Sequence, residues 1–216
     1  GSGFDGPGTG AKLLVHRTSV DDVEVDGTLG NDDLDRVVAR DALGELSLGR
    51  SGVRHYGRNG EAREEAVSVF IEAFAAPPRM LVFGAVDFTA ALVRVAKVLG
   101  YHVTVCDARA KFVTPERFPN VDELIVEWPD EFLARTHIDE RTAICVLTHD
   151  DKFDVPILKV AVESNAGYIG AMGSRRTTEK RKARLRDEGI SDKQIARIHA
   201  PIGLKLGART PEEVAV

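Results

Sequence analysis

From residue 79 onward the sequence alternates short apolar runs with longer stretches of helical spacing, and this rhythm strongly restricts the possible fold. Strands of this length that alternate with helices predict a parallel sheet covered by helices on both faces. The runs read MLVF, HVTVCD, ELIVEW, AICVLTH and YIGAM. The pattern therefore predicts a doubly wound α/β fold, whose ligands bind at the carboxyl ends of the strands.

Helix boundaries can be read in the same region. Apolar residues from Phe88 to Leu99 follow helical spacing, and Gly100 is placed to end that helix. Asp154 is a candidate cap for the helix VPILKVAVES, and a long charged helix is expected from about Ser174 to Gly189. The stretches SDKQ and TPEE each have the spacing of a capping box.

The first part of the chain has a different composition. Residues 1–10 are half glycine and are expected to be a tag, a linker or a disordered lead-in. Residues 11–76 mix strand and helix patterns, with Asn31 as a plausible helix cap and AVSVFIEAFA as a strand. Two prolines at 77 and 78 mark a predicted domain boundary, so residues 77–216 are expected to form the α/β domain.

Bulk properties exclude several classes of protein. The net charge is −5, which argues against a nucleic-acid binder. No apolar run reaches the roughly 18 residues that a membrane helix needs, and no signal peptide is visible. The two cysteines, Cys106 and Cys145, lie in apolar runs and are expected to be buried reduced thiols of a cytoplasmic protein. Their spacing makes no metal signature, and no metal site is expected.

The loop after the first predicted strand of this domain resembles a dinucleotide-binding loop in part. It reads Gly84-Ala85-Val86-Asp87, so Val86 stands where a second glycine would let a pyrophosphate approach the backbone. The carboxylate of Asp87 would suit the helix dipole but repel a phosphate. This loop is either a modified cofactor loop or a simple strand–helix turn.

The second predicted strand ends in two charged residues. Asp107 lies 23 positions after Gly84, close to the spacing of the acidic residue that binds a ribose hydroxyl. Arg109 can instead meet a 2′-phosphate, which would make NAD(P) a possible cofactor. The alternative is that Asp107 merely caps the end of its strand.

The loop after the fifth strand is a stronger phosphate candidate. Gly173, Ser174, Arg175 and Arg176 supply a glycine, a hydroxyl N-cap and two guanidinium groups at a helix start. Backbone N–H groups and an arginine can together hold an anion there. The helix from Lys180 onward is expected to be a solvated basic surface, and without aromatic residues among its charges it is no typical nucleic-acid reader.

The fourth strand ends in Thr148, His149 and Asp150. Histidine can transfer protons near neutral pH, so His149 is the candidate catalytic residue. The alternative is a hydrogen-bonded structural histidine. Thr148 and Asp150 are placed to face the same ligand.

Taken together, GYHVTVCDAR, THD, YIGAMGSRR and PIGLKLGARTPEE resemble the XdhC/CoxI family, the accessory proteins of xanthine dehydrogenase and related molybdenum hydroxylases. The stretch DGTLGNDDLDRVV resembles part of that family's smaller N-terminal domain. The resemblance implies a Rossmann-like domain beside a partial N-terminal α+β domain.

The resemblance also implies a function. Such proteins bind molybdenum cofactor (molybdopterin), protect it during sulfuration and pass it to the apo-enzyme, with a cysteine desulfurase and a second copy of the chain as partners. A chaperone is therefore expected rather than a catalyst. The alternatives are an NAD(P)-dependent oxidoreductase, or an interaction subunit whose nucleotide site is vestigial.

Overall fold

The computed structural model describes residues 10–18, 22–148 and 150–216, with nothing described for the side chain of Asp151. It divides into two compact units, Gly1–Ala76 and Pro77–Val216. All but the last residue of the expected lead-in at 1–10 lies outside the described residues. None of the described helices is both long enough and apolar enough to span a membrane.

The first unit is a small α+β structure with two antiparallel hairpins. Its elements are β1 (Lys12–Arg17), β2 (Val23–Thr28), α1 (Asp32–Leu48), β3 (Gly52–Tyr56) and β4 (Val67–Ile71). The prediction that Asn31 caps a helix is confirmed, because its side chain accepts hydrogen bonds from the backbone N–H groups of Asp33 and Leu34. The buried apolar cluster of this unit is small and comprises Leu29, Leu34, Val38 and Tyr56.

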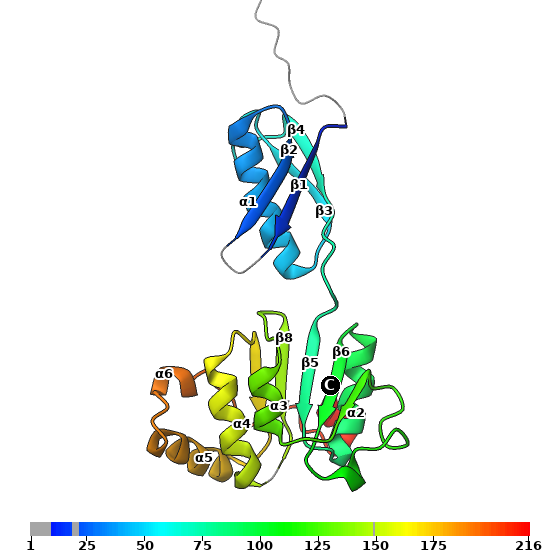
Figure 1. The fold of residues 1–216 in the computed structure, drawn as a ribbon, viewed down its shortest axis with the longest axis vertical. Helices are drawn as coiled ribbons and strands as arrows, with labels where there is room; N and C mark the ends of the chain where they lie inside the picture. Colours follow the sequence, from blue (N-terminus) through cyan, green and yellow to red (C-terminus); the bar gives the residue numbers. More distant parts are fainter. Residues whose placement is uncertain (1–9, 19–21, 149) are drawn as a thin grey trace, which may run out of the picture. The chain divides into compact units, whose positions relative to one another are not determined.

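The second unit contains a six-stranded parallel sheet, and Figure 1 shows β5 and β6 running in the same direction. Its strands are β5 (Arg79–Phe83), β6 (His102–Cys106), β7 (Glu123–Ile125), β8 (Thr142–Val146), β9 (Tyr168–Ala171) and β10 (Ile198–His199). Its helices are α2 (Asp87–Val98), α3 (Pro129–Arg135), α4 (Asp151–Glu163), α5 (Arg175–Asp187), α6 (Asp192–Ile195) and α7 (Pro211–Ala215), with a short 3₁₀ turn at Ala110–Phe112.

The strand order is β10-β9-β8-β5-β6-β7, and all neighbouring strands are parallel. The chain moves outward from β5 to β7, then returns to β8 and moves the other way. The topological switch point therefore lies between β5 and β8, where doubly wound folds bind ligands. The predicted fold class is confirmed.

The two faces of the sheet have separate cores, because successive strand residues point to opposite sides. Leu81, Phe83 and Val146 pack with α3, α4 and α5 on one face. Met80, Val82 and Cys145 pack on the other face with α2. The buried strands explain the apolar runs in the sequence.

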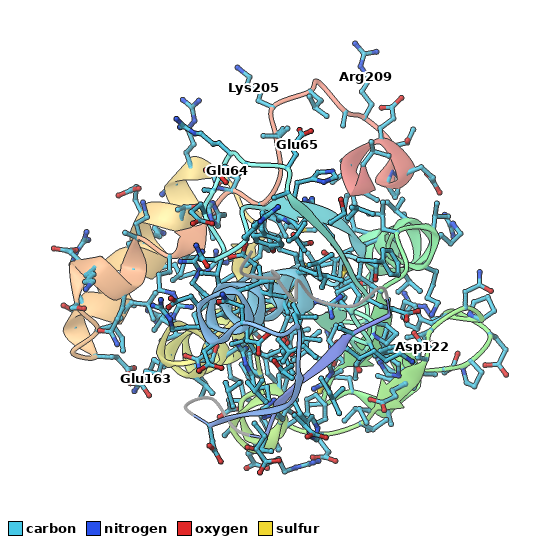
Figure 2. The ribbon with its side chains drawn as sticks, turned by 90° about the horizontal axis from the view of Figure 1, so that it is seen from above. Glu64, Glu65, Asp122, Glu163, Lys205 and Arg209 are labelled. Carbon is cyan, nitrogen blue, oxygen red and sulfur yellow. The ribbon has the colours of Figure 1, made fainter. Side chains whose placement is uncertain are left out.

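The segment from Ile202 to the end of the chain lies over the face that carries α2. The backbone N–H of Ile202 donates to the carbonyl of Ala171 at 2.9 Å, and Arg94 of α2 pairs with Glu212 of α7 at 2.8 Å. An apolar pocket of about 430 Å³ lies beneath this segment. Lys205 and Arg209 project away from the segment (Figure 2) and do not line the pocket.

Candidate functional site

The loop between β5 and α2 is held closed by its own hydrogen bonds. Gly84 has a φ of +109°, and a Cβ at this position would lie 2.9 Å from Thr148 Cγ2. The hydroxyl of Thr89 donates to the carbonyl of Gly84 at 2.5 Å and accepts from the N–H of Val86 at 3.4 Å. Thr89 is fully buried. Thr89 stands where the dinucleotide-binding pattern G-x-G-x-x-G has its third glycine. Its hydroxyl joins Gly84 to Val86 and so holds the loop together.

Asp107 ties the end of β6 to this loop. One carboxylate oxygen accepts from the backbone N–H and Nε of Arg109, both at 2.9 Å. The other accepts from the N–H of Ala85 at 2.9 Å and from Nη2 of Arg109 at 2.7 Å. Asp107 is 3% exposed. Its acceptor positions are directed at the protein itself, which argues for the strand-end cap over the ribose ligand.

The charges of this pair reinforce one another. Burial alone would raise the pKa of Asp107, but the hydrogen bonds from Arg109 and from the N–H of Ala85 lower it below its ordinary value. The hydrogen bond to Asp107 raises the pKa of Arg109, and the nearby charge of Asp150 adds to that shift. The ends of β6 and β8 are thus close enough for Arg109 and Asp150 to interact.

Arg117 is a residue that the sequence analysis did not identify. Its Nη1 donates to the carbonyls of Ala85 and Phe112, at 2.9 and 3.0 Å. Its Nη2 donates to Asp87 at 3.2 Å. Asp87 is otherwise exposed at the start of α2. No motif marks Arg117, because its role depends on a loop that lies thirty residues earlier in the chain.

The turn between β9 and α5 is built differently. The Ser174 hydroxyl accepts from the N–H of Thr177 at 3.1 Å, which confirms Ser174 as the N-cap of α5. Gly173 has a φ of +149°, and Arg175 and Arg176 are exposed on the first turn of the helix. A capped helix N-terminus with exposed guanidinium groups can hold an anion.

Arg181 corrects the expectation that α5 from Lys180 onward is a solvated surface. Its side chain is 2% exposed, and its Nη2 pairs with the carboxylate of Asp154 and donates to the carbonyl of Met172 at 3.0 Å. Asp154 also accepts from the hydroxyl of Thr148. This buried chain of contacts joins the end of β8 to the β9–α5 turn.

Asp154 is also not the cap that the sequence suggested. The helix α4 begins three residues earlier, and Asp150 caps it by accepting from the N–H of Lys152 at 3.0 Å. Asp154 lies inside the helix and is 1% exposed. The candidate catalytic residue His149 lies outside the described residues.

The ends of four strands therefore meet at one edge. Gly84, Ala85, Asp107 and Arg109 contact one another at the ends of β5 and β6. Gly84 lies close to Thr148. The hydroxyl of Thr148 donates to Asp154, and Asp154 pairs with Arg181, which lies beside the turn at Gly173. Among the described residues no group of three or more His, Cys, Asp or Glu side chains could hold a metal ion.

Over residues 80–216 the sequence matches the family described as the XdhC Rossmann domain. The chain belongs to the XdhC family. The resemblance to XdhC/CoxI proteins is therefore confirmed, and the parallel sheet described above is the Rossmann domain of that family.

Three relatives extend the comparison of this XdhC chain. It is 30% identical to the uncharacterized protein YqeB of Escherichia coli over 97% of this chain and 39% of the relative. It is 31% identical to a Bacillus subtilis protein named as a probable subunit of xanthine dehydrogenase, over 71% of this chain and 44% of the relative. It is 36% identical to the molybdenum cofactor insertion chaperone PaoD of Escherichia coli over 38% of this chain and 26% of the relative. The chain spans less than half the length of these curated relatives.

A solved structure supports the fold of the XdhC chain. A protein described as a xanthine dehydrogenase from Bacillus halodurans superposes with a TM-score of 0.60 over 89% of this chain and 64% of its own. The two sequences are 23% identical. At that identity the likeness concerns the fold alone.

The cysteines of this XdhC chain are buried and unpaired, as the sequence predicted. Burial raises the pKa of both thiols, Cys106 and Cys145, to about 12. A thiol with so high a pKa is protonated at neutral pH and is a poor nucleophile. Neither cysteine is therefore suited to act as a nucleophile.

Proposed function

We propose that this chain is an accessory protein of xanthine dehydrogenase-type molybdenum hydroxylases that binds molybdenum cofactor and delivers it to the apo-enzyme. Membership in the XdhC family supports the accessory role. A relative named as a molybdenum cofactor insertion chaperone supports the choice of ligand. The proposal extends to a cysteine desulfurase and a second copy of this chain as partners.

The turn between β9 and α5 is the observation that carries the proposal. It presents the N-terminus of a 13-residue helix, the cap Ser174 and the exposed side chain of Arg175 at the carboxyl edge of the sheet. Helix N-termini and arginine forks recognise phosphate groups. Ser174, Arg175 and the start of α5 suit the phosphate group of a pterin cofactor. They would bind this phosphate and so orient the cofactor. The cofactor itself supplies the molybdenum chemistry once it reaches the hydroxylase.

An NAD(P)-dependent oxidoreductase is the competing function. Dinucleotide binding in the usual manner needs a free carboxylate for the ribose and an open glycine loop for the pyrophosphate. Here the carboxylate of Asp107 accepts four hydrogen bonds from Ala85 and Arg109, and Val86 adds a branched side chain to the loop. These features favour the pterin ligand over the nicotinamide dinucleotide.

The test is an anaerobic calorimetric titration with molybdenum cofactor, NADP, NAD and CTP. We expect tight binding of the pterin cofactor and weak binding of the nicotinamide nucleotides. Tight binding of NAD or NADP alone would favour the oxidoreductase. Binding of none of these ligands would favour an interaction subunit with a vestigial site.

A variant identifies the residue that meets the phosphate. Arg175→Ala removes a charged donor, so we expect the dissociation constant for the cofactor to rise about 10- to 100-fold. Lys180→Ala is the matched control, because Lys180 is exposed on the same helix beyond its first turn. Equal affinities of Arg175→Ala and the unmodified chain would remove Arg175 from the site.

A further inference from the structure

The guanidinium group of Arg181 has unused hydrogen-bonding capacity. Nη2 is engaged by Asp154 and by the carbonyl of Met172. Nε and Nη1 are buried, and in the described part of the chain they have no hydrogen-bond partner. A buried charged donor without an acceptor is costly, and such groups in folded proteins are usually paired. These two nitrogens therefore lack an acceptor among the described residues.

The Nη1 group of this guanidinium faces the β9–α5 turn. A Cβ built on Gly173 would lie 3.7 Å from Nη1 of Arg181 and 3.4 Å from Cβ of Thr177. Because Gly173 has no side chain, a methyl-sized group fits at this position in van der Waals contact with the guanidinium. An acceptor atom that enters past Gly173 would reach Nη1 directly.

The electrostatic surroundings favour an anion in that space. The helix α5 begins here with roughly half a positive charge at its N-terminus, whereas the N-terminus of α4 is already met by the carboxylate of its cap Asp150. Asp154 neutralises one cation, but Arg175 and Arg176 add two more at the start of α5. Asp154 also fixes the guanidinium, because the hydroxyl of Thr148 holds the same carboxylate. The exposed arginines thus place positive charge at the turn, and the fixed, planar guanidinium of Arg181 lies beneath them.

We infer that Arg181 forms the inner wall of an oxyanion site, and that the ligand is the tetrahedral oxyanion of a phosphate ester. One oxygen of the phosphate accepts from Nη1 past Gly173, while the outer oxygens meet Arg175 and the first turn of α5. This inference rests on the proposed function, because it takes the same turn as the phosphate site and adds the residue that binds from within.

The test uses inorganic phosphate as the probe, titrated by calorimetry against chloride at equal ionic strength. Arg181→Lys keeps the charge opposite Asp154 but removes the planar fork, so we expect the dissociation constant for phosphate to rise at least tenfold. Arg186→Lys is the matched control, because Arg186 lies on the same helix with its side chain 50% exposed. Unchanged phosphate affinity in folded Arg181→Lys would overturn the inference, as would the absence of phosphate binding by the unmodified chain.

A second variant covers the case in which Arg181→Lys does not fold. Gly173→Ala keeps Arg181 but places a methyl group in the space beside Nη1, and we expect phosphate binding to weaken at least fivefold. Unchanged affinity would again overturn the inference. The two proposals fail separately. If these variants lose phosphate binding but the unmodified chain does not bind molybdenum cofactor, the oxyanion site stands and the proposed function is wrong. If the chain binds the cofactor equally well with and without Arg181→Lys, the proposed function stands and the inference about Arg181 is wrong.

Discussion

Two strand-to-helix loops at the same edge of the sheet differ in what they do with their polar groups. The β5–α2 loop satisfies its groups internally: the N–H of Ala85 meets Asp107, the carbonyl of Ala85 meets Arg117, and Thr89 clamps Gly84. The β9–α5 turn leaves two arginines exposed on its outer side. Behind it, Arg181 has two buried nitrogens whose N–H groups have no acceptor among the described residues.

The comparison shows that resemblance to a phosphate loop and capacity to bind a phosphate are separate properties. The β5–α2 loop has the position and the first glycine of a dinucleotide fingerprint, but the N–H groups of Gly84, Ala85 and Val86 are already used. The β9–α5 turn matches no such fingerprint and has donors available. Unused donors, rather than glycine spacing, indicate where an anion can be bound.

The largest expected effect is at Gly84, and Gly173 is its comparison. A Cβ at Gly84 would lie 2.9 to 3.1 Å from atoms of Thr148 and Leu147, two of which belong to the backbone. At Gly173 the nearest atoms are 3.4 Å away. Both residues have positive φ, so both substitutions are strained, but only Gly84→Ala adds severe contacts. We expect Gly84→Ala to lower the free energy of unfolding by about 3 kcal/mol, and Gly173→Ala by about 1 kcal/mol.

Urea denaturation followed by circular dichroism measures both variants. The ratio of the two losses is the informative quantity, since each variant is the other's control. Equal losses would mean that the first loop is no more tightly packed than the second, and the comparison between them would fail.

A smaller effect is expected at Asp107. Asp107→Asn weakens the charge-assisted bonds to Arg109, whose side chain is 44% exposed, so we expect a loss of about 1.5 kcal/mol at pH 7. The pKa of Asp107 is lowered in the folded state. Its contribution to stability is therefore present above the unfolded pKa, near 3.9, and is lost as the pH falls further.

Urea unfolding between pH 7 and pH 3 tests this sign. The difference in unfolding free energy between the unmodified chain and Asp107→Asn should shrink below about pH 4. Glu116→Gln is a suitable control, because Glu116 has a lowered pKa but lies exposed with local hydrogen bonds. A difference that stays constant with pH would show that the Asp107 charge does not hold the loop closed.

The smallest effect is expected at the cap of α5. Ser174→Ala removes the acceptor for the N–H of Thr177 and should cost about 1 kcal/mol of unfolding free energy. The same substitution at Ser191, which caps α6 through the same type of bond, gives a matched comparison. An effect of Ser174→Ala on phosphate affinity, beyond that of Ser191→Ala, would show that this cap also orients the anion site.

Local features of the fold could be predicted from the sequence. The caps Asn31 and Ser174 and the boxes at Ser191–Gln194 and Thr210–Glu213 were found where expected, because a cap depends on residues within one turn. Most strands were also found, because buried parallel strands read as apolar runs. Three strands were missed: β2 and β3 are largely exposed and lack an apolar run, and β10 has only two residues.

The chemistry of the edge could be predicted only in part. The sequence predicted Ser174, Arg175 and Asp107 at the ends of strands, because each follows an apolar run directly in the chain. It did not reveal that Arg117 bonds the carbonyl of Ala85, or that Arg181 lies buried against Asp154. These pairs are separated by 32 and 27 residues, and no periodicity links them.

The sequence by itself determined the alternation of strands and helices, the family and the caps, because each depends on short-range pattern or on residues that are adjacent in the chain. Only the tertiary structure decided which charged residues are solvated and which are buried. Seven basic residues stand in the twelve from Arg175 to Arg186, and the packing of α5 against α4 turns Arg181 inward. Burial removes water from that guanidinium and leaves two of its nitrogens without an acceptor among the described residues.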